Sequence, residues 1–333
     1  MPEKATVLTR ATNVLLLADP PELYGNGAGE ASPAERREFY RFGAARSSLS
    51  RIMVPLVAVA ARRSSKEKAM HGNPRALLDQ ITLVHGPHEL LARYVVMADA
   101  MAREWGLRLR LRSDFDALID LNREHRESWP PLPPICDPAH SNLRIDSAFW
   151  LEGIDSFGDT VVTEFGRFFD FRDTNLVEEI RALRVYYEHP APHRAAGECV
   201  EIDAPAATVV RGRTMYGGAI WVRPDWRRSG LTRIISHVCA AYAHTRWNTA
   251  FTWGFMEPRM HAGGLSRAYG PHEAAEGLLV RMPFRGDLPT VLLWMRTGAL
   301  LADLATSVDA AMIAGQGYPH GEILAARGLP RQD

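Results

Sequence analysis

Lysine is almost absent from this chain of 333 residues. Only Lys4, Lys66 and Lys68 occur among the 39 basic residues, and 39 acidic residues bring the formal net charge to zero. A protein that binds nucleic acid through its phosphates needs a basic face, so this balance argues against that class. The arginine bias is typical of a GC-rich bacterial genome, and it leaves no lysine to act as a catalytic group in the core.

Cysteine, long apolar runs and metal-ligand spacings are scarce as well. Cys136, Cys199 and Cys239 form no C-x-x-C pair, so neither a disulfide framework nor a zinc knuckle is indicated. The longest apolar run, residues 52–61, is too short to span a bilayer, and the N-terminus lacks the pattern of a signal peptide. The histidines are scattered, so we expect no metal. The composition predicts a soluble cytoplasmic protein without a membrane span.

The first 105 residues predict an N-terminal extension that is partly flexible and then helical. Residues 25–33 are rich in Gly, Ala and Ser, which is typical of a loop, and residues 46–63 could form a helix. A clearer helix begins at Pro87 and ends before Gly106.

A strand, a helix and a hairpin are predicted next. Residues 107–112 alternate leucine and arginine, as a half-exposed strand does, and Ser113 to Asp116 read as the capping box of a helix. Residues 149–154 and 160–171 predict two strands joined in a hairpin around Gly158 and Asp159. An insertion over residues 174–208 follows, with a helix over 176–188, and we expect it to lie at the edge of a sheet and to shape a pocket.

The most informative segment is an Arg/Gly turn between a strand, residues 216–222, and a helix that begins at Leu231. The free N–H groups and the positive dipole end of the first helical turn converge there. Gly230 lets the backbone approach a ligand closely, and Arg227 and Arg228 add positive charge. This combination predicts a phosphate or pyrophosphate site.

These residues resemble the acyl-CoA-binding motif of the GCN5-related N-acetyltransferase (GNAT) superfamily, a strand ending V-x-P followed by [QR]-x-x-G-x-[GA] at a helix start. Val222 and Pro224 match the strand end. Arg227 and Gly230 match the motif, whereas Thr232 replaces its last Gly or Ala and adds a branched side chain on the path of the pantetheine arm. The resemblance implies acetyl-CoA or another acyl-CoA as co-substrate, bound by Ile220, Trp221, Val222, Arg227, Arg228, Ser229, Gly230, Leu231 and Thr232.

The surrounding elements follow the order of the same family. Residues 249–256, 264–269 and 277–282 predict its closing strand, helix and strand. We therefore expect an α/β fold with a GNAT-like mixed, mostly antiparallel sheet over residues 106–285, flanked by helices. Residues 286–333 are predicted to be a C-terminal helical tail, with a helix over 288–313 that packs on the N-terminal helices or on a second copy of the chain.

The resemblance also implies a chemistry. In the family the cofactor strand and the next strand splay apart, pantetheine lies in the gap, a backbone N–H near Val222 binds the oxyanion, and a tyrosine protonates the departing thiolate. Tyr269 is the only tyrosine in the corresponding helix, although the family tyrosine usually lies one turn earlier. The cofactor strand carries no Asp, Glu or His, so Glu257 and His261 are the candidate bases.

Aromatic residues gather on the strands around this site. Most are expected to be core, and some could line an apolar pocket for the acceptor or for an acyl group longer than acetyl; they are Trp150, Phe157, Phe168, Phe169, Trp221 and Trp253.

The sequence thus predicts an acyl-CoA-dependent N-acyltransferase that transfers an acyl group directly to an amine. Two alternatives remain open: an acyltransferase that takes its acyl group from an acyl carrier protein, and a non-catalytic GNAT-like module that binds a CoA ester or a partner protein.

Overall fold

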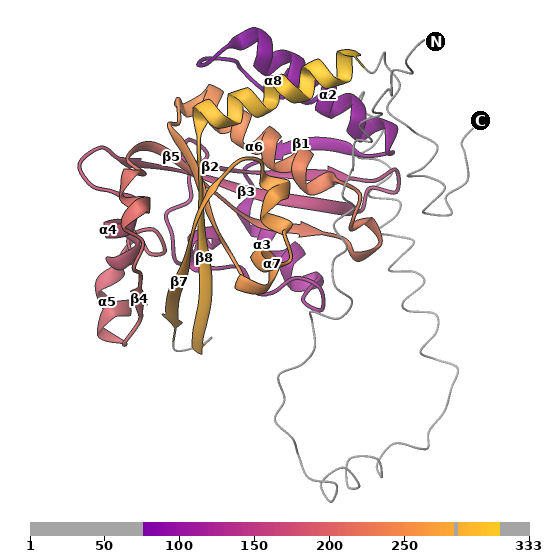
Figure 1. Ribbon diagram of the computed structural model, residues 1–333. Helices are drawn as coiled ribbons and strands as arrows, with labels where there is room; N and C mark the ends of the chain where they lie inside the picture. The colour runs from indigo at the N-terminus through magenta and orange to yellow at the C-terminus, as the bar shows by residue number, and fades with distance from the viewer. Residues whose placement is uncertain (1–75, 283–285, 314–333) are drawn as a thin grey trace, which may run out of the picture.

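The computed structural model of the protein describes residues 76–282 and 286–313, and its centre is a single eight-stranded sheet (Figure 1). The strand order is β1-β2-β3-β5-β6-β8-β7-β4, and every neighbouring pair is antiparallel except β5 and β6, which are parallel. The strands are β1 (Arg108–Arg112), β2 (Ala148–Ile154), β3 (Thr160–Phe171), β4 (Cys199–Glu201), β5 (Gly212–Val222), β6 (Phe251–Met256), β7 (Glu273–Met282) and β8 (Gly286–Arg296). This mixed, mostly antiparallel sheet with helices on both faces confirms the predicted fold class.

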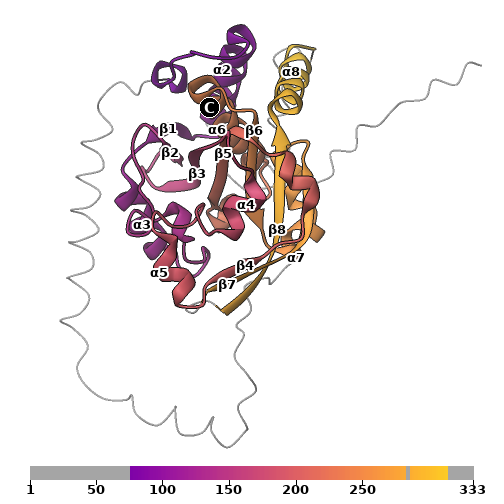
Figure 2. The same cartoon turned by 90° about the vertical axis from the view of Figure 1, so that its left-hand side faces the viewer.

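Helices cover the two faces of the sheet unequally. Three long helices share one apolar core with one face: α2 (His88–Glu104), α6 (Leu231–Trp247) and α8 (Thr297–Ile313). Helices α2 and α8 lie side by side above the sheet (Figures 1 and 2). The opposite face is covered by α3 (Phe115–Glu124), by α4 (Leu176–Arg181) and by short turns. The remaining helical elements are η2 (Leu77–Gln80), η3 (Pro134–Cys136), α5 (Pro190–Ala195), η4 (Pro205–Val209), η5 (Pro224–Trp226), α7 (Pro258–Ala262) and η6 (Leu265–Tyr269).

The insertion after the hairpin lies at the edge of the sheet, as predicted. Its α4, α5 and β4 come to the front in Figure 2, and β4 pairs with β7 at the end of the sheet farthest from β1. The predicted helix over 176–188 is too long, since α4 ends at Arg181. The chain turns at Leu183, which has a positive φ of 60° that helical residues do not adopt.

The predicted helix over residues 288–313 is half wrong. Residues 286–296 form β8, a strand between β6 and β7, and only Thr297–Ile313 are helical. Val291 to Met295 are all buried, because the strand is covered on both faces. The spacing of apolar residues cannot show whether such a continuous apolar run forms a buried strand or a buried helix. The sheet therefore extends past the expected boundary at residue 285.

Smaller expectations are met or corrected by one residue. The helix predicted from Pro87 is α2, and both hairpin strands lie where they were predicted. The cap of α3 is Asp114 and not Ser113, because the Asp114 side chain accepts the Ala117 N–H at 3.2 Å. The loop over 25–33 and the helix over 46–63 fall outside the described residues.

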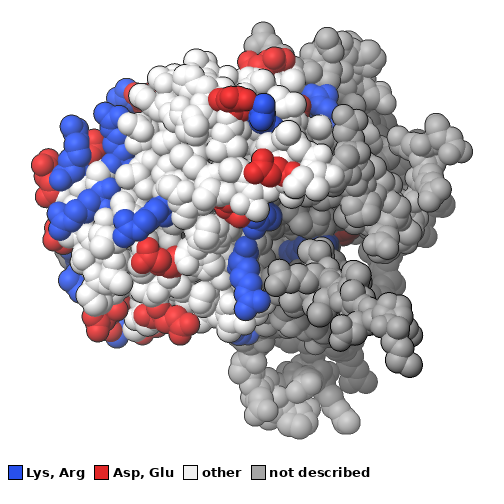
Figure 3. Space-filling model, turned by 45° about the horizontal axis from the view of Figure 1, so that its top comes forward, with Lys and Arg blue, Asp and Glu red and all other residues white. Residues whose placement is uncertain are grey.

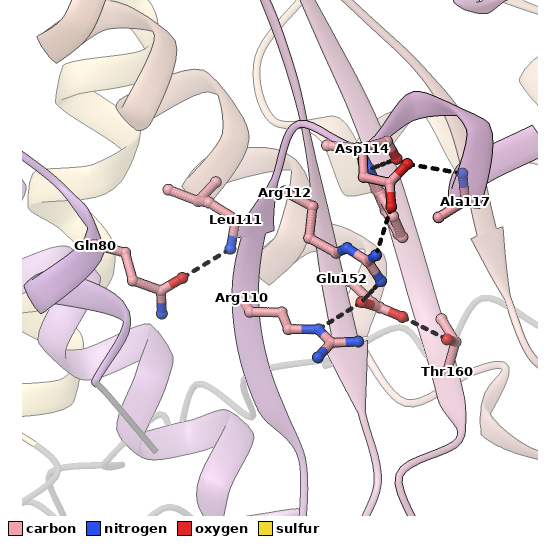
Figure 4. Close-up of polar contacts among 9 residues, drawn as sticks. Gln80, Arg110, Leu111, Arg112, Asp114, Ala117, Glu152 and Thr160 are labelled. Carbon is pink, nitrogen blue, oxygen red and sulfur yellow. Dashed lines mark hydrogen bonds and ion pairs between the residues drawn. The ribbon is translucent and has the colours of Figure 1, made fainter. Parts of the chain in front are cut away.

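The edge strand β1 is held to β2 by ionic contacts (Figure 4). Glu152 on β2 accepts hydrogen bonds from Arg110 at 2.6 Å, from Arg112 at 3.1 Å and from the Thr160 hydroxyl at 2.6 Å. Although burial acts to raise the pKa of Glu152, these partners together lower it. Glu152 therefore stays ionised and fixes the register of the sheet edge.

The surface carries mixed charge. On the side where α2 and α8 lie, basic and acidic side chains are interspersed over the described residues (Figure 3). Within the described ranges, no helix combines the length and apolar character that a membrane span requires.

Candidate active site

The site begins where β5 and β6 part. The two strands pair only from Thr214–Tyr216 to Phe251–Trp253, although β5 continues to Val222 and β6 to Met256. Beyond Tyr216, β5 keeps its partner β3 but has no paired strand on its other side among the described residues. A register shift between Thr163 and Phe165 and a positive φ of 52° at Ala219 mark a bulge in β5 there.

Glycines allow the close approach at this parting point. A Cβ on Gly254 would lie 2.6 Å from the carbonyl oxygen of Gly217, which no side chain could accept. On the α6 face, a Cβ on Gly217 would lie 3.2 Å from Oε1 of Glu164. On the opposite face, the hydroxyl of Tyr216 lies over Gly218 and occupies the space of a side chain. The missing side chains therefore make room for polar groups on both faces of the strand.

The backbone of β5 points hydrogen-bond donors into the gap. The N–H of Arg223 donates to Val161 on β3 at 2.7 Å. Because successive N–H groups of a strand point to opposite sides, the N–H of Val222 points away from β3, into the gap beside β5. The carbonyl of Val222 points the same way and accepts Nε of Arg227 at 3.1 Å.

The Arg/Gly turn is braced by its first arginine. The Arg227 guanidinium bonds the carbonyl oxygens of Val222 and Ser128, both at 3.1 Å, and so ties the strand end to the segment after α3. Arg228 and Gly230 have positive φ values of 65° and 79°. A Cβ on Gly230 would meet nothing within 4 Å, so the space in front of the α6 N-terminus is open.

A cavity of about 1770 Å³ joins these features. All of the residues predicted to bind the cofactor line it: Ile220, Trp221, Val222, Arg227, Arg228, Ser229, Gly230, Leu231 and Thr232. Its walls also include residues of β6, η6 and α2, so the cavity runs from the α6 N-terminus through the gap between the strands.

The three predicted acid–base residues are placed differently. Tyr269 ends η6 and lines the cavity, and burial together with the nearby Glu164 raises the pKa of its hydroxyl. Glu257 lines the cavity as an exposed residue at the end of β6. His261 is not part of the cavity lining; its Nε2 lies 3.8 Å from Glu276 and its ring meets His272 edge-on. The structure thus brings Tyr269 and Glu257 to the cavity and leaves His261 outside it.

Sequence reasoning missed Glu164. This residue on β3 is buried, lines the cavity, and accepts the Ser236 hydroxyl of α6 at 2.8 Å. Burial raises the pKa of its carboxyl to about 8, because the bond from Ser236 offsets only part of the desolvation. The available signal was an acidic residue in a predicted strand, near the apolar residues Val162 and Phe165.

Aromatic rings line the cavity on the face opposite α6. Tyr186 from the insertion stacks on Phe255 of β6, with ring centroids 5.8 Å apart and planes at 11°. At the end of β5, Trp221 lies between His125, at 4.4 Å, and Trp129, at 5.4 Å. Of the aromatic residues singled out from the sequence, Trp221 and Trp253 line the cavity, whereas Phe157 is exposed.

Other chemistries find less support in the part of the chain that the structure describes. No group of three or more His, Cys, Asp or Glu side chains there is arranged to hold a metal ion. Cys239 is buried in α6, and burial raises the pKa of its thiol well above the ordinary value, which disfavours a nucleophilic thiolate.

No protein-family model matches the chain, and no curated protein matches it. Three solved structures illustrate what it is similar to. An aminoglycoside acetyltransferase, AAC(6')-Ib, with paromomycin and acetyl-CoA is 15% identical, over 58% of this chain and 95% of that one, with a TM-score of 0.33. Arabidopsis thaliana NAA60 with acetyl-CoA is 8% identical, over 56% of this chain and 97% of that one, with a TM-score of 0.35.

The third is a variant of the spermidine N-acetyltransferase SpeG from Vibrio cholerae, 13% identical over 59% of this chain and 96% of that one, with a TM-score of 0.34. At such identities and TM-scores, these proteins say nothing of this chain's substrate or of its site residues. The strand order, the gap between β5 and β6 and the helix after β5 are the chain's own features, and together they form the GNAT-like fold that its sequence predicts.

Proposed function

We propose that this protein is an acyl-CoA-dependent N-acyltransferase of the GNAT type, which transfers an acetyl or longer acyl group to an amine. One observation carries the proposal: β5 and β6 part after three paired residues, and the gap between them opens at the N-terminus of α6. An extended pantetheine arm fits beside an unpaired strand, and a pyrophosphate fits the free N–H groups of a helix start.

The chain's own residues suit the binding of such a donor. Gly230 leaves open space at the helix start, and Arg228 adds positive charge to the cavity wall, whereas Arg233 is paired with Asp303 at 2.7 Å. Arg227 contributes by holding the loop in shape through its bonds to Val222 and Ser128. The N–H of Val222 points into the gap, where it can bond the acyl oxygen as that oxygen gains charge.

Acyl-CoA would supply the acyl group as a thioester. Transfer forms a C–N bond and breaks the C–S bond, so one proton leaves the amine and one reaches the sulfur. Tyr269 lines the cavity and is proposed to face the departing sulfur. Of the two bases expected from the sequence, only Glu257 lines the cavity, and it is the proposed first acceptor of the proton from an amine that enters from solvent.

The aromatic side of the cavity is proposed to receive the acceptor or a longer acyl chain. Tyr186, Phe255 and Trp253 give that side an apolar surface, which favours a substrate with an apolar body. The amine acceptor itself is not specified by these residues.

Binding and turnover would test the proposal separately. Thermal denaturation with CoA, acetyl-CoA and long-chain acyl-CoAs should show stabilisation, about 2.7 kcal/mol for a ligand at about 100 times its dissociation constant. Free-thiol release with a panel of amines should then reveal transfer. Binding of CoA without thiol release from any donor would favour the non-catalytic module or a carrier-protein donor. No binding of any CoA derivative would refute the proposal.

A further inference from the structure

A buried carboxyl group lies directly behind the gap between the strands. Glu164 projects from β3 toward α6, where Ser236 donates to its Oε2 at 2.8 Å. Its other oxygen, Oε1, lies toward β5, 3.2 Å from the point where Gly217 would carry a Cβ. Glu164, Ser236 and Gly217 all line the cavity. Strand β5 has no carboxyl side chain of its own. The neighbouring strand β3 supplies one through Glu164, which reaches past Gly217 because a glycine has no side chain.

We propose that Glu164 is the proton-transfer group of this site, which gives its proton to the departing sulfur and takes up the proton that the amine releases. The inference rests on the proposed function, since it assigns a catalytic residue to that reaction. The exposed Glu257 then takes only the proton that an ammonium ion gives up as it enters from solvent, and Tyr269 is the neighbour that bonds the sulfur or passes the proton.

The groups around Glu164 keep the proton on it near neutral pH. Ser236 and Cys239 lie near it on α6 and Tyr269 on η6, while Tyr216 of β5 lies on the opposite face of the sheet. None of these groups is a cation, so burial dominates and raises the pKa of Glu164 to about 8. The pKa of an ordinary thiol is about 8.5, so a carboxyl with this pKa can protonate a thiolate readily. Tyr269 alone is a weaker acid, because burial raises the pKa of its hydroxyl above the ordinary value.

One carboxyl is enough to balance the reaction. The C–N bond forms as the C–S bond breaks, the electron pair of that bond stays on sulfur, and the Glu164 proton neutralises it. The new amide nitrogen carries one proton too many, and the Glu164 carboxylate accepts it, so the site returns to its first state. The sulfur and the amine nitrogen bond the same acyl carbon, the one before transfer and the other after it, so they lie within about 3.5 Å of one another. A group in the gap can therefore serve both, directly or through Tyr269.

The pH dependence of the full chain tests this assignment. We expect kcat of the wild type to fall above about pH 8, where Glu164 loses its proton. The Glu164→Gln substitution keeps the shape of the side chain and should lower kcat by about 10²- to 10⁴-fold. The dissociation constant for CoA, measured by calorimetry, should not change. Because Ser236 lowers the pKa of Glu164, Ser236→Ala should move the alkaline fall to higher pH. Glu89→Gln, on the exposed first turn of α2 outside the cavity lining, is the control and should change none of these values.

Several outcomes would overturn the assignment. If Glu164→Gln keeps the wild-type rate and its fall at alkaline pH, another group transfers the proton. Loss of activity in Glu257→Gln alone would assign proton transfer to Glu257. A Glu164 carboxyl that titrates near pH 4.5, seen in the infrared difference spectrum between the wild type and Glu164→Gln, would refute it without any activity assay. Failure of the wild type to bind CoA would instead refute the proposed function, and the assignment with it.

Discussion

The sheet presents two different surfaces to the cavity, one beneath α6 and the other beneath the insertion and the segment after α3. On the α6 side the wall is a regular helix of 17 residues whose small side chains, such as Ala240, pack closely on β3 and β5. Glu164, Ser236 and the α6 N-terminus lie on this side. On the other side large rings such as Tyr186 and Trp129 come from irregular segments.

This difference suggests a division of labour. Proton transfer and anion binding need positions fixed to a fraction of an ångström, and a packed helix provides them. Substrate selection needs a surface that can differ between related proteins, and irregular segments tolerate such change. Substitutions on the α6 side should therefore alter the rate, the pH dependence or donor binding, and substitutions on the aromatic side should alter packing and acceptor selection.

The largest effect is expected on stability as a function of pH. An unfolded glutamate ionises near pH 4.5, whereas folded Glu164 keeps its proton to about pH 8. Between these values the unfolded state binds fewer protons, so Glu164 makes the folded state progressively less stable as the pH rises. At about 1.4 kcal/mol per pH unit, the total is on the order of 5 kcal/mol. Urea denaturation should show that the free energy of unfolding of the wild type falls between pH 5 and pH 9, and that the fall is much smaller in Glu164→Gln. An equal fall in both proteins would contradict the raised pKa of Glu164.

The second prediction concerns Tyr269 on the same side. Tyr269→Phe should lower kcat by about 10²- to 10⁴-fold with little change in the affinity for either substrate, because the hydroxyl is proposed to act when charge develops on sulfur. Tyr242→Phe removes a hydroxyl from α6 that lies outside the cavity and bonds Arg246 at 2.9 Å, so it is the matched control. Equal rates for the two variants, measured by thiol release, would remove Tyr269 from the mechanism.

The third prediction tests the proposed anion site at the helix start. Valine at Gly230 must adopt a φ near 79°, which costs about 1–2 kcal/mol, and it fills the open space in front of α6. We expect the affinity for CoA to fall by more than about tenfold, a loss above about 1.4 kcal/mol. Gly197 in the insertion has a φ of 91° and equally open surroundings, and it is not part of the cavity lining. Gly197→Val should therefore cost similar stability and leave CoA binding, measured by calorimetry, unchanged.

The sequence predicted the side of the cavity that depends on local signals. The Arg/Gly turn, α6 and the hairpin each occupy a continuous segment, so spacing and periodicity identify them. Glu164 was missed because its chemistry depends on partners far along the chain, Ser236 on α6 and Gly217 on β5. Strand β8 was predicted to be helical because Val291 to Met295 are apolar without alternation, and only the sheet shows why.

His261 remains an untested candidate base that the structure leaves outside the cavity lining. Its position soon after Glu257 suggested a base near the reacting centre, but α7 directs its ring toward His272 and Glu276. Proximity in sequence does not fix the direction of a side chain on so short a helix. The aromatic residues were also selected correctly only in part, because Phe157 lies exposed in the hairpin turn while Trp221 and Trp253 reach the cavity.

The fourth prediction compares neighbouring tyrosines on the aromatic side. The Tyr187 hydroxyl bonds Glu198, which also bonds His193, whereas the buried Tyr186 hydroxyl has no hydrogen-bond partner among the described residues. Tyr187→Phe should lower the free energy of unfolding by about 1–3 kcal/mol, because a buried carboxylate loses a partner. Tyr186→Phe should leave it unchanged or raise it slightly. Denaturant unfolding of both variants would decide, and an equal loss would mean that the Tyr186 hydroxyl is satisfied in solution.

The smallest effect is expected at Thr232, the one departure from the family motif. It is the second residue of α6, partly buried, and its side chain lines the cavity where the pantetheine arm is proposed to pass. Thr232→Gly widens the passage, while loss of the side chain removes little else, so we expect the binding free energy of CoA to improve by no more than about 0.5 kcal/mol. Thr232→Ser removes only the methyl group and keeps the hydroxyl. Calorimetric titration of both variants separates the effect of the methyl group from that of the hydroxyl. Weaker CoA binding in Thr232→Gly, with unchanged binding in Thr232→Ser, would show that the hydroxyl contacts the ligand and does not obstruct it.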